Sequence, residues 1–331
     1  MADGGGAKRL KTAEDGAAGT AESADSGQEE GSLQVSPSGV AFDLSRVDAD
    51  LVTHITSFLG TPHELLNLAL TCKSFGWRQP LSARTWSLVE EVARQAVCSR
   101  ATDDEMGCLP QCDVTTWLSI LHRFEHMLDF DVLLGGSIEH VNGDKTAVCA
   151  TDPNDCSSVA VSSGYAMRSG AHYAEFLITG IPFIGIVRPM PGLDAGAYQE
   201  NFSFIWANDS RLHPDFLAQR SDDWDDSDVH ACDFNCDDGK MSWTNWDDEL
   251  NEGKEWDGME SCQSGDTVGM LLNLDEGTLS VYRNNRLLGV LKTGLSGPYC
   301  WHVNLFKQQT VTDAVSIKRG TLPNSEGATT A

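Results

Sequence analysis

Two cysteine pairs are the residues whose spacing comes closest to that of a metal site. Cys108 and Cys112 lie four positions apart, as do Cys232 and Cys236, and His230 precedes the second pair. Thiolates and imidazoles are the usual ligands of tetrahedral zinc, although pairs separated by only two residues would be a stronger indication. The alternative interpretation is that these thiols are small buried apolar groups. We expect the second case, with no bound metal and no cofactor.

A strongly acidic segment is the second candidate for chemistry. Residues 222–260 hold fifteen Asp and Glu residues but only two basic residues, Lys240 and Lys254. The net charge of this segment is therefore −13, half of the −26 of the whole chain. Such density suggests Ca²⁺, but counting from Asp223 or Asp226 gives no glycine at the sixth position of an EF-hand loop. We therefore interpret the segment as a solvated acidic surface loop, which could attract a basic partner.

Motifs of the common enzyme classes are missing from the sequence. There is no phosphate loop, dinucleotide fingerprint or nucleophile elbow, and His63-Glu64 lacks the second histidine of a zinc protease motif. We expect no catalytic residue. A metal-dependent enzyme that uses the acidic segment remains a remote alternative.

Composition limits the class of protein further. The 331 residues are 40% hydrophobic, which suits two domains with a sizeable core. The net charge of −26 argues against binding to nucleic acid or to anionic membranes, and no apolar run reaches the length of a membrane span. Ten cysteines without an export signal in the first 31 residues predict reduced thiols in the cytoplasm or the nucleus.

Helical periodicity dominates the first part of the chain after a tail of low complexity. Residues 1–39 are too polar to bury a core, so we expect them to be disordered. Helices are predicted from Asp48 to Gly60, from Thr61 onward with Glu64 closing a capping box, and from about Ser82. Residues 98–112 are expected to form a loop, and 116–130 another helix.

The first three helices resemble an F-box. The residues that match its pattern are Leu51-Val52, Ile55, Phe58-Leu59, Leu65, Leu68 and Thr71 to Phe75. Two mild departures are the missing Leu-Pro opening near Val47 and Phe75 in place of a tryptophan. The resemblance implies docking on a Skp-type adaptor of a cullin ligase. The residues implied in that contact are Leu51, Ile55, Phe58, Leu65, Leu68 and Cys72.

From Val132 the pattern changes to short alternating strands. Strands are predicted at 159–162, 172–179, 183–187, 202–207, 240–243, 267–274, 278–283 and 286–291, with a two-residue Asn284-Asn285 hairpin turn before the last. Apolar residues on both faces of 267–274 favour a sandwich core. We therefore predict a mainly β fold, an antiparallel bent β-sandwich preceded by a helical bundle.

Motifs in this half of the chain resemble the SPRY family in type and order. They are Ser163-Gly164, Ala171 to Phe176, Ile184 to Val187, Gly265-Asp266, Val268-Gly269, Leu272 to Asp275, Gly277 to Leu279, Tyr282 to Asn284 and Tyr299 to Phe306. The resemblance covers roughly residues 132–319. It implies a concanavalin-like sandwich that binds other proteins through its loops.

The two resemblances together imply a domain order and a function. The order is a disordered tail at 1–39, an F-box-like module at 40–98, a helical linker at 99–131, the sandwich at 132–319 and a second tail at 320–331. The implied function is a substrate receptor of a cullin-type ubiquitin ligase, and the alternative is a scaffold without a ligase link. We predict target binding at Thr244–Ser261, through Trp246, Asp247, Asp248, Glu249 and Trp256, although both tryptophans suit a core equally well.

Overall fold

A computed structural model places the elements of the chain. It describes His54 and residues 61–71, 73–76, 86–110, 115–151, 157–205, 211–247, 250–306 and 312–322. All of these belong to one compact unit, Leu44–Ala331. The residues predicted as a disordered tail at 1–39 and as a first helix at 48–60 lie outside the described part, except His54.

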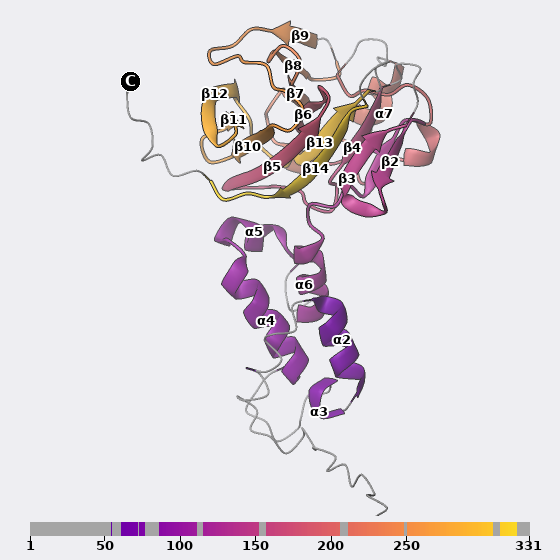
Figure 1. Cartoon of the computed structure of the whole chain (residues 1–331), viewed down its shortest axis with the longest axis vertical. Helices are drawn as coiled ribbons and strands as arrows, with labels where there is room; N and C mark the ends of the chain where they lie inside the picture. The colour runs from indigo at the N-terminus through magenta and orange to yellow at the C-terminus, as the bar shows by residue number, and fades with distance from the viewer. Residues whose placement is uncertain are drawn as a thin grey trace, which may run out of the picture. The chain divides into compact units, whose positions relative to one another are not determined.

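Five helices occupy the described residues before the first strand (Figure 1). They are α2 (Pro62–Thr71), α3 (Lys73–Gly76), α4 (Leu88–Arg100), α5 (Asp103–Cys108) and α6 (Trp117–Glu125). Thr61 and Glu64 form the predicted capping box of α2, since each side chain accepts from the other residue's backbone amide. The face of each longer helix that turns inward is apolar, and its buried residues include Leu65, Val92, Val97, Leu121 and Phe124.

Three of the helix predictions differ from the structure, and the first is that the helix expected at 116–130 ends at Glu125. The helix expected from Ser82 begins at Leu88, because Ser87 caps it by accepting from the amide of Glu90. The loop expected at 98–112 contains α5, which Thr102 starts with a reciprocal capping box to Glu105. A six-residue helix buries no side chain, so hydrophobic periodicity carries no signal for it.

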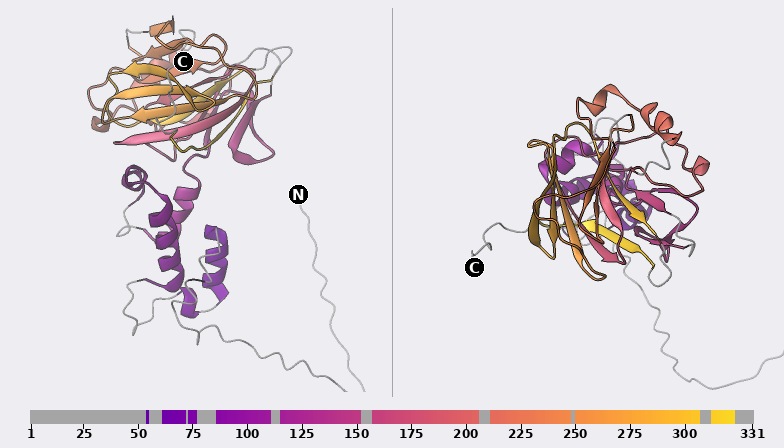
Figure 2. Two further views of the ribbon diagram at one scale, coloured as in Figure 1. Left: turned by 60° about the vertical axis from the view of Figure 1, so that its left-hand side comes forward. Right: turned by 90° about the horizontal axis from the view of Figure 1, so that it is seen from above.

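The described residues from Val132 onward form two antiparallel sheets of seven strands each, which confirms the predicted antiparallel sandwich (Figure 2). Sheet A has the order β1-β4-β13-β6-β7-β8-β9, and sheet B has the order β12-β11-β10-β5-β14-β3-β2. Sheet A comprises β1 (Val132–Leu134), β4 (Ser158–Val161), β13 (Cys300–Leu305), β6 (Phe183–Val187), β7 (Ala231–Asn235), β8 (Met241–Thr244) and β9 (Leu250–Lys254). Sheet B comprises β12 (Arg286–Thr293), β11 (Thr278–Arg283), β10 (Thr267–Asn273), β5 (Ala171–Thr179), β14 (Ala314–Arg319), β3 (Asp144–Ala150) and β2 (Ile138–Val141).

In the meander β10–β11–β12, β11 has its predicted bounds, whereas β10 ends one residue earlier than predicted and β12 two residues later. Arg283 pairs with Arg286 across the two-residue turn, and Asn284 and Asn285 have φ of 50° and 65°. Asparagine tolerates this left-handed region, which matches the right-handed twist of the flanking strands.

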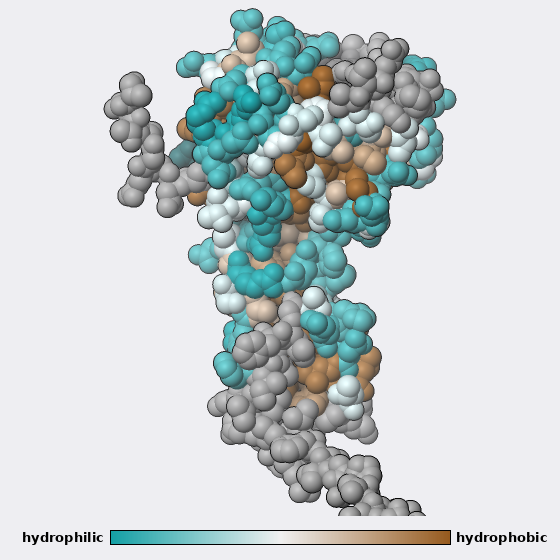
Figure 3. All heavy atoms as spheres, in the orientation of Figure 1, coloured by the Kyte–Doolittle hydropathy of each residue, from teal (hydrophilic) through white to brown (hydrophobic). Residues whose placement is uncertain are grey.

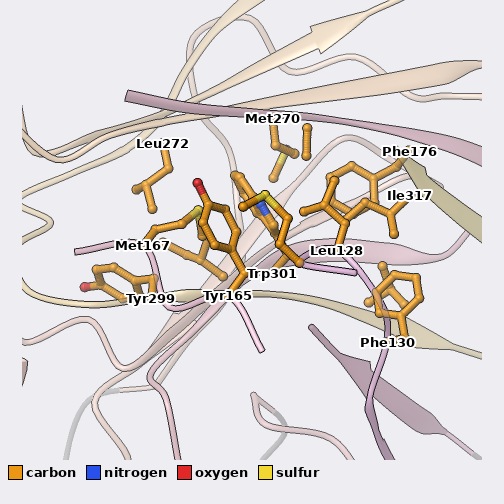
Figure 4. Packing of buried hydrophobic residues seen from close by; sticks show 14 of the residues in the cluster. Leu128, Phe130, Tyr165, Met167, Phe176, Met270, Leu272, Tyr299, Trp301 and Ile317 are labelled. Carbon is orange, nitrogen blue, oxygen red and sulfur yellow. The ribbon is translucent and has the colours of Figure 1, made fainter. Parts of the chain in front are cut away.

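Sheet A is apolar on both faces, which gives the sandwich two cores. One face packs on sheet B, where Trp301, Phe176, Met270 and Ile317 converge (Figure 4). The other face lies under the 188–230 connection and α7 (His213–Leu217), with Phe204 and Phe216 in its core. The strand predicted at 202–207 is not formed at Phe202 to Ile205, because these buried residues fill the second core as an irregular segment.

Candidate interaction surfaces

Helix α2 carries those of the predicted adaptor-binding residues that the structure describes. Leu65 is fully buried, with 0% of its surface exposed, and Leu68 is half-buried against the same core. Leu65 therefore lies inside the helical module, where it cannot contact a partner without unfolding. Leu51, Ile55, Phe58 and Cys72 lie outside the described residues.

The outer face of α2 is apolar at residues that the sequence pattern did not select. Leu66 and Leu70 are 47% and 77% exposed, and their spacing of four puts them on one side of the helix. Figure 3 shows an apolar area over this part of the helical segment. Leucines lie on two faces of this helix, and each face has helical spacing. The sequence alone therefore did not distinguish the buried face from the exposed one.

Trp246 is a core residue, which corrects its assignment to the target-binding loop. Its side chain is 1% exposed, and its ring lies 4.9 Å from that of Phe216 and 5.4 Å from that of His230. The indole Nε1–H donates to the carbonyl oxygen of Phe204 at 2.8 Å. Because the second core covers sheet A here, a tryptophan after β8 has an apolar site to fill.

Trp256 and Trp243 are half-buried. The indole Nε1–H of Trp256 donates to the carbonyl oxygen of Gly239 at 2.7 Å, and its ring meets Phe234 edge-on. Lys292 lies over the ring of Trp243 at 4.1 Å. Trp256 is thus the aromatic residue of the predicted target-binding loop that keeps an accessible face.

The acidic segment is not one loop, since β7, β8 and β9 all lie within it. Asp247 is exposed, whereas Asp248 and Glu249 lie outside the described residues. The exposed acids on the β9 side are Glu252, Glu255 and Asp257. The predicted target-binding residues therefore divide into exposed acids and tryptophans that are buried or half-buried.

A denser group of exposed acids precedes β7. We name it the acidic rim; its members are Asp222, Asp223, Asp225, Asp226 and Asp228. Trp224 lies among them but is buried in the second core. Arg168 bonds to Asp223 at 3.0 Å, with both side chains largely exposed, so this ion pair leaves the rim strongly negative.

Arg188 holds the backbone of the acidic rim from the buried side, and the sequence analysis did not select this residue. Its guanidinium is fully buried and donates to the carbonyl oxygens of Ser227, Ser296 and Pro298. The same group lies over the rings of Trp224 and Tyr299. A buried arginine directly after β6 carries no local sequence signal, because its partners come from distant loops.

Further buried titratable groups lie on the second-core face of sheet A. His302, Gly185 and Asp233 are register partners across β13, β6 and β7. Burial raises the pKa of Asp233 well above its usual value and lowers the pKa of His302 to about 3. The His302 side chain is therefore neutral near pH 7. Asp233 and His302 both carry polar atoms without a hydrogen-bond partner in the structure.

Metal binding finds no support in the described part of the chain. No group of three or more His, Cys, Asp and Glu side chains there could hold an ion. Cys236 lies beside Cys262, whose backbone amide donates to its carbonyl oxygen, and Cys112 is outside the described residues. Among these same residues no helix is long and apolar enough to cross a membrane.

Comparison with known proteins gives structural neighbours only. No family model matches the chain, and no curated protein matches it. The SPRY domain of human HERC1 is 12% identical, with a TM-score of 0.35 over 52% of this chain and 87% of that chain. A human SPRY domain is 15% identical, with a TM-score of 0.32 over 54% and 95%. The PSpry domain of TRIM65 is 12% identical, with a TM-score of 0.32 over 60% and 96%.

Proposed function

We propose that this chain is a protein-interaction protein that acts as a substrate receptor of a cullin-type ubiquitin ligase. The helical module docks on a Skp-type adaptor, and loops of the sandwich capture a target. The F-box-like and SPRY-like motifs of the sequence support this division of labour. The transfer chemistry belongs to other subunits, so no catalytic residue is required of this chain.

The exposed leucine pair on α2 is the observation that carries the proposal. Leu66 and Leu70 leave two large apolar side chains in water on a helix whose opposite face is already packed. If an apolar partner surface covers these two side chains, each Å² of apolar area that leaves water contributes about 25 cal/mol of favourable free energy to binding. A short apolar helix face of this kind suits a groove-type contact with another protein.

The test is a double substitution on the exposed face. Leu66→Asp with Leu70→Asp should abolish binding to a purified Skp-type adaptor in titration calorimetry, because it puts two charges into a desolvated contact. Asn67→Asp is the matched control, since it adds a charge to the same helix at an exposed polar position and should preserve binding. Wild-type protein without adaptor binding at micromolar concentration would reject the ligase link and leave the scaffold alternative.

We place the target contact at the acidic side of the sandwich, on the acidic rim and the exposed acids around β9, with Trp256 as the aromatic contact. The predicted partner is basic, because like-signed carboxylates attract Lys and Arg side chains and speed their encounter. A basic target should bind at least tenfold more weakly at 0.5 M salt than at 0.05 M salt. Equal affinity at the two concentrations, measured by fluorescence anisotropy, would refute the electrostatic part of the proposal.

A further inference from the structure

Two buried cysteines contact each other although residues 237–261 separate them in sequence. Cys236 follows β7 of sheet A, and Cys262 precedes β10 of sheet B. The backbone amide of Cys262 donates to the carbonyl oxygen of Cys236 at 2.8 Å. The two thiols also lie near enough for each to affect the pKa of the other. The contact therefore joins the two sheets at one point.

The geometry of this pair suits a covalent bond. A disulfide spans Cα atoms about 4.4–6.8 Å apart, with the two side chains directed at each other. The direct backbone hydrogen bond keeps the two main chains adjacent, within the range that a disulfide needs, and both side chains are buried there. We propose that Cys236 and Cys262 are a redox-sensitive thiol pair, which closes to a disulfide when the folded protein meets a hydroperoxide.

The two thiols differ in reactivity. The neighbouring Cys236 thiol and the positive charge of Arg283 lower the pKa of Cys262, whereas burial raises that of Cys236. Cys262 also keeps 4% of its surface exposed, while Cys236 keeps none. Arg283 is fixed in place by ion pairs to Glu260 at 2.6 Å and Asp266 at 2.8 Å. Cys262 is thus the attacking thiol, because the thiolate is the reactive form.

The reaction proceeds in two balanced steps. The Cys262 thiolate attacks one peroxide oxygen, the O–O bond breaks, and the departing oxygen leaves as water after taking a proton. This gives a sulfenic acid on Cys262. The Cys236 sulfur then attacks the Cys262 sulfur, so that the S–S bond forms and the S–O bond breaks. The thiol proton of Cys236 leaves with the second water. Together the two thiols lose two electrons, and one hydrogen peroxide is reduced to two waters.

Closure would have a measurable structural effect. It would tie residues 237–261, with β8 and β9, into a covalent loop and join the two sheets. A cross-link of that length restricts the unfolded chain, which should raise the melting temperature by roughly 5–10 °C.

The test treats the full-length folded protein with hydrogen peroxide, alkylates the remaining thiols and maps the linked peptides by mass spectrometry. We expect a Cys236–Cys262 linked peptide, a higher melting temperature, and the loss of both after a thiol reductant. A linked peptide that forms only after the protein is denatured would overturn the proposal. This readout uses the wild-type chain and does not depend on whether a variant folds.

Single substitutions assign the roles of the two thiols. Cys236→Ser should leave Cys262 trapped as a sulfenic acid that reacts with dimedone, whereas Cys262→Ser should give neither that adduct nor the linked peptide. Cys232→Ser is the matched control, because Cys232 is a buried thiol on β7, the strand that precedes Cys236, and burial raises its pKa. It should leave cross-linking unchanged. Equal dimedone labelling of Cys232 and Cys262 would refute the assignment of Cys262 as the attacking thiol.

Discussion

Replacing Trp246 by alanine should destabilise the sandwich, because the residue is the centre of an aromatic cluster. Besides Phe216 and His230, its ring lies 6.0 Å from that of Trp224 and 6.1 Å from that of Phe204. Its φ of 59° is unusual for a large side chain, so the surrounding structure must hold this conformation. The indole therefore fills the centre of this core, and the packing around it holds the backbone of Trp246 in its unusual conformation.

The expected loss follows from the buried area and from the hydrogen bond. A tryptophan buries about 150–250 Å², which at about 25 cal/mol per Å² gives an upper bound of about 4–6 kcal/mol. Core tryptophan-to-alanine changes cost about 3–5 kcal/mol, and the carbonyl of Phe204 would lose its donor. We therefore expect a loss of about 4 kcal/mol in the free energy of unfolding, a large part of the roughly 5–15 kcal/mol typical of a domain.

Urea denaturation followed by tryptophan fluorescence and circular dichroism measures this change. Trp246→Phe should cost only about 1–2 kcal/mol, because it keeps most of the ring and loses the indole N–H. Trp243→Ala is the matched control, since that half-buried tryptophan lies three residues away and should cost about half as much as Trp246→Ala. A loss below about 1 kcal/mol for Trp246→Ala, with an unchanged m-value, would show that the indole is not a core residue.

Two other changes test the buried carboxyl group of Asp233 and the tail. Burial raises the pKa of Asp233 above its unfolded value, so its contribution to stability is present at acid pH and is lost as pH rises. Asp233→Asn should therefore raise the melting temperature at pH 8 and raise it less at pH 5; a gain that is equal at both pH values would contradict this. Deleting residues 1–39 should shift the melting temperature by no more than about 2 °C, because a polar tail buries little. A drop of ten degrees in calorimetry would show that these residues stabilise the fold.

The elements that could be predicted from the sequence are those whose structure depends on residues close in the chain. The bounds of β11 and the Asn284-Asn285 turn follow from period-two alternation and from the left-handed tolerance of asparagine. Strand β6 matches its predicted bounds of 183–187, since a short apolar run between turn residues has few other solutions. Backbone preferences and the alternation of neighbouring side chains determine such elements, so a single sequence is enough to predict them.

What the sequence could not predict depends on contacts between distant segments. Phe202 and Phe204 alternate like strand residues, yet they fill a second core whose other wall is sheet A. Trp246 looked equally suited to surface and core, because only the presence of that second core decides between them. Cys236 follows a strand of sheet A and Cys262 precedes a strand of sheet B, and no spacing rule links them. Exposure and pairing of this kind are properties of the folded chain.

The buried Arg188 explains how the fold holds so many acids close together. Five carboxylates at the acidic rim repel one another, and this repulsion would favour an open, extended segment. Arg188 opposes it in two ways: its donation to the carbonyl of Ser227 fixes the backbone inside the rim, and its charge interacts favourably with Asp225. Burying the guanidinium costs solvation, which three carbonyl acceptors and the faces of Trp224 and Tyr299 offset in part, while Nε has no hydrogen-bond partner. The buried Arg188 with its two aromatic neighbours and the exposed acids of the rim therefore form one arrangement. It gives the protein a negative surface of fixed structure at a segment that the sequence suggested was a solvated loop.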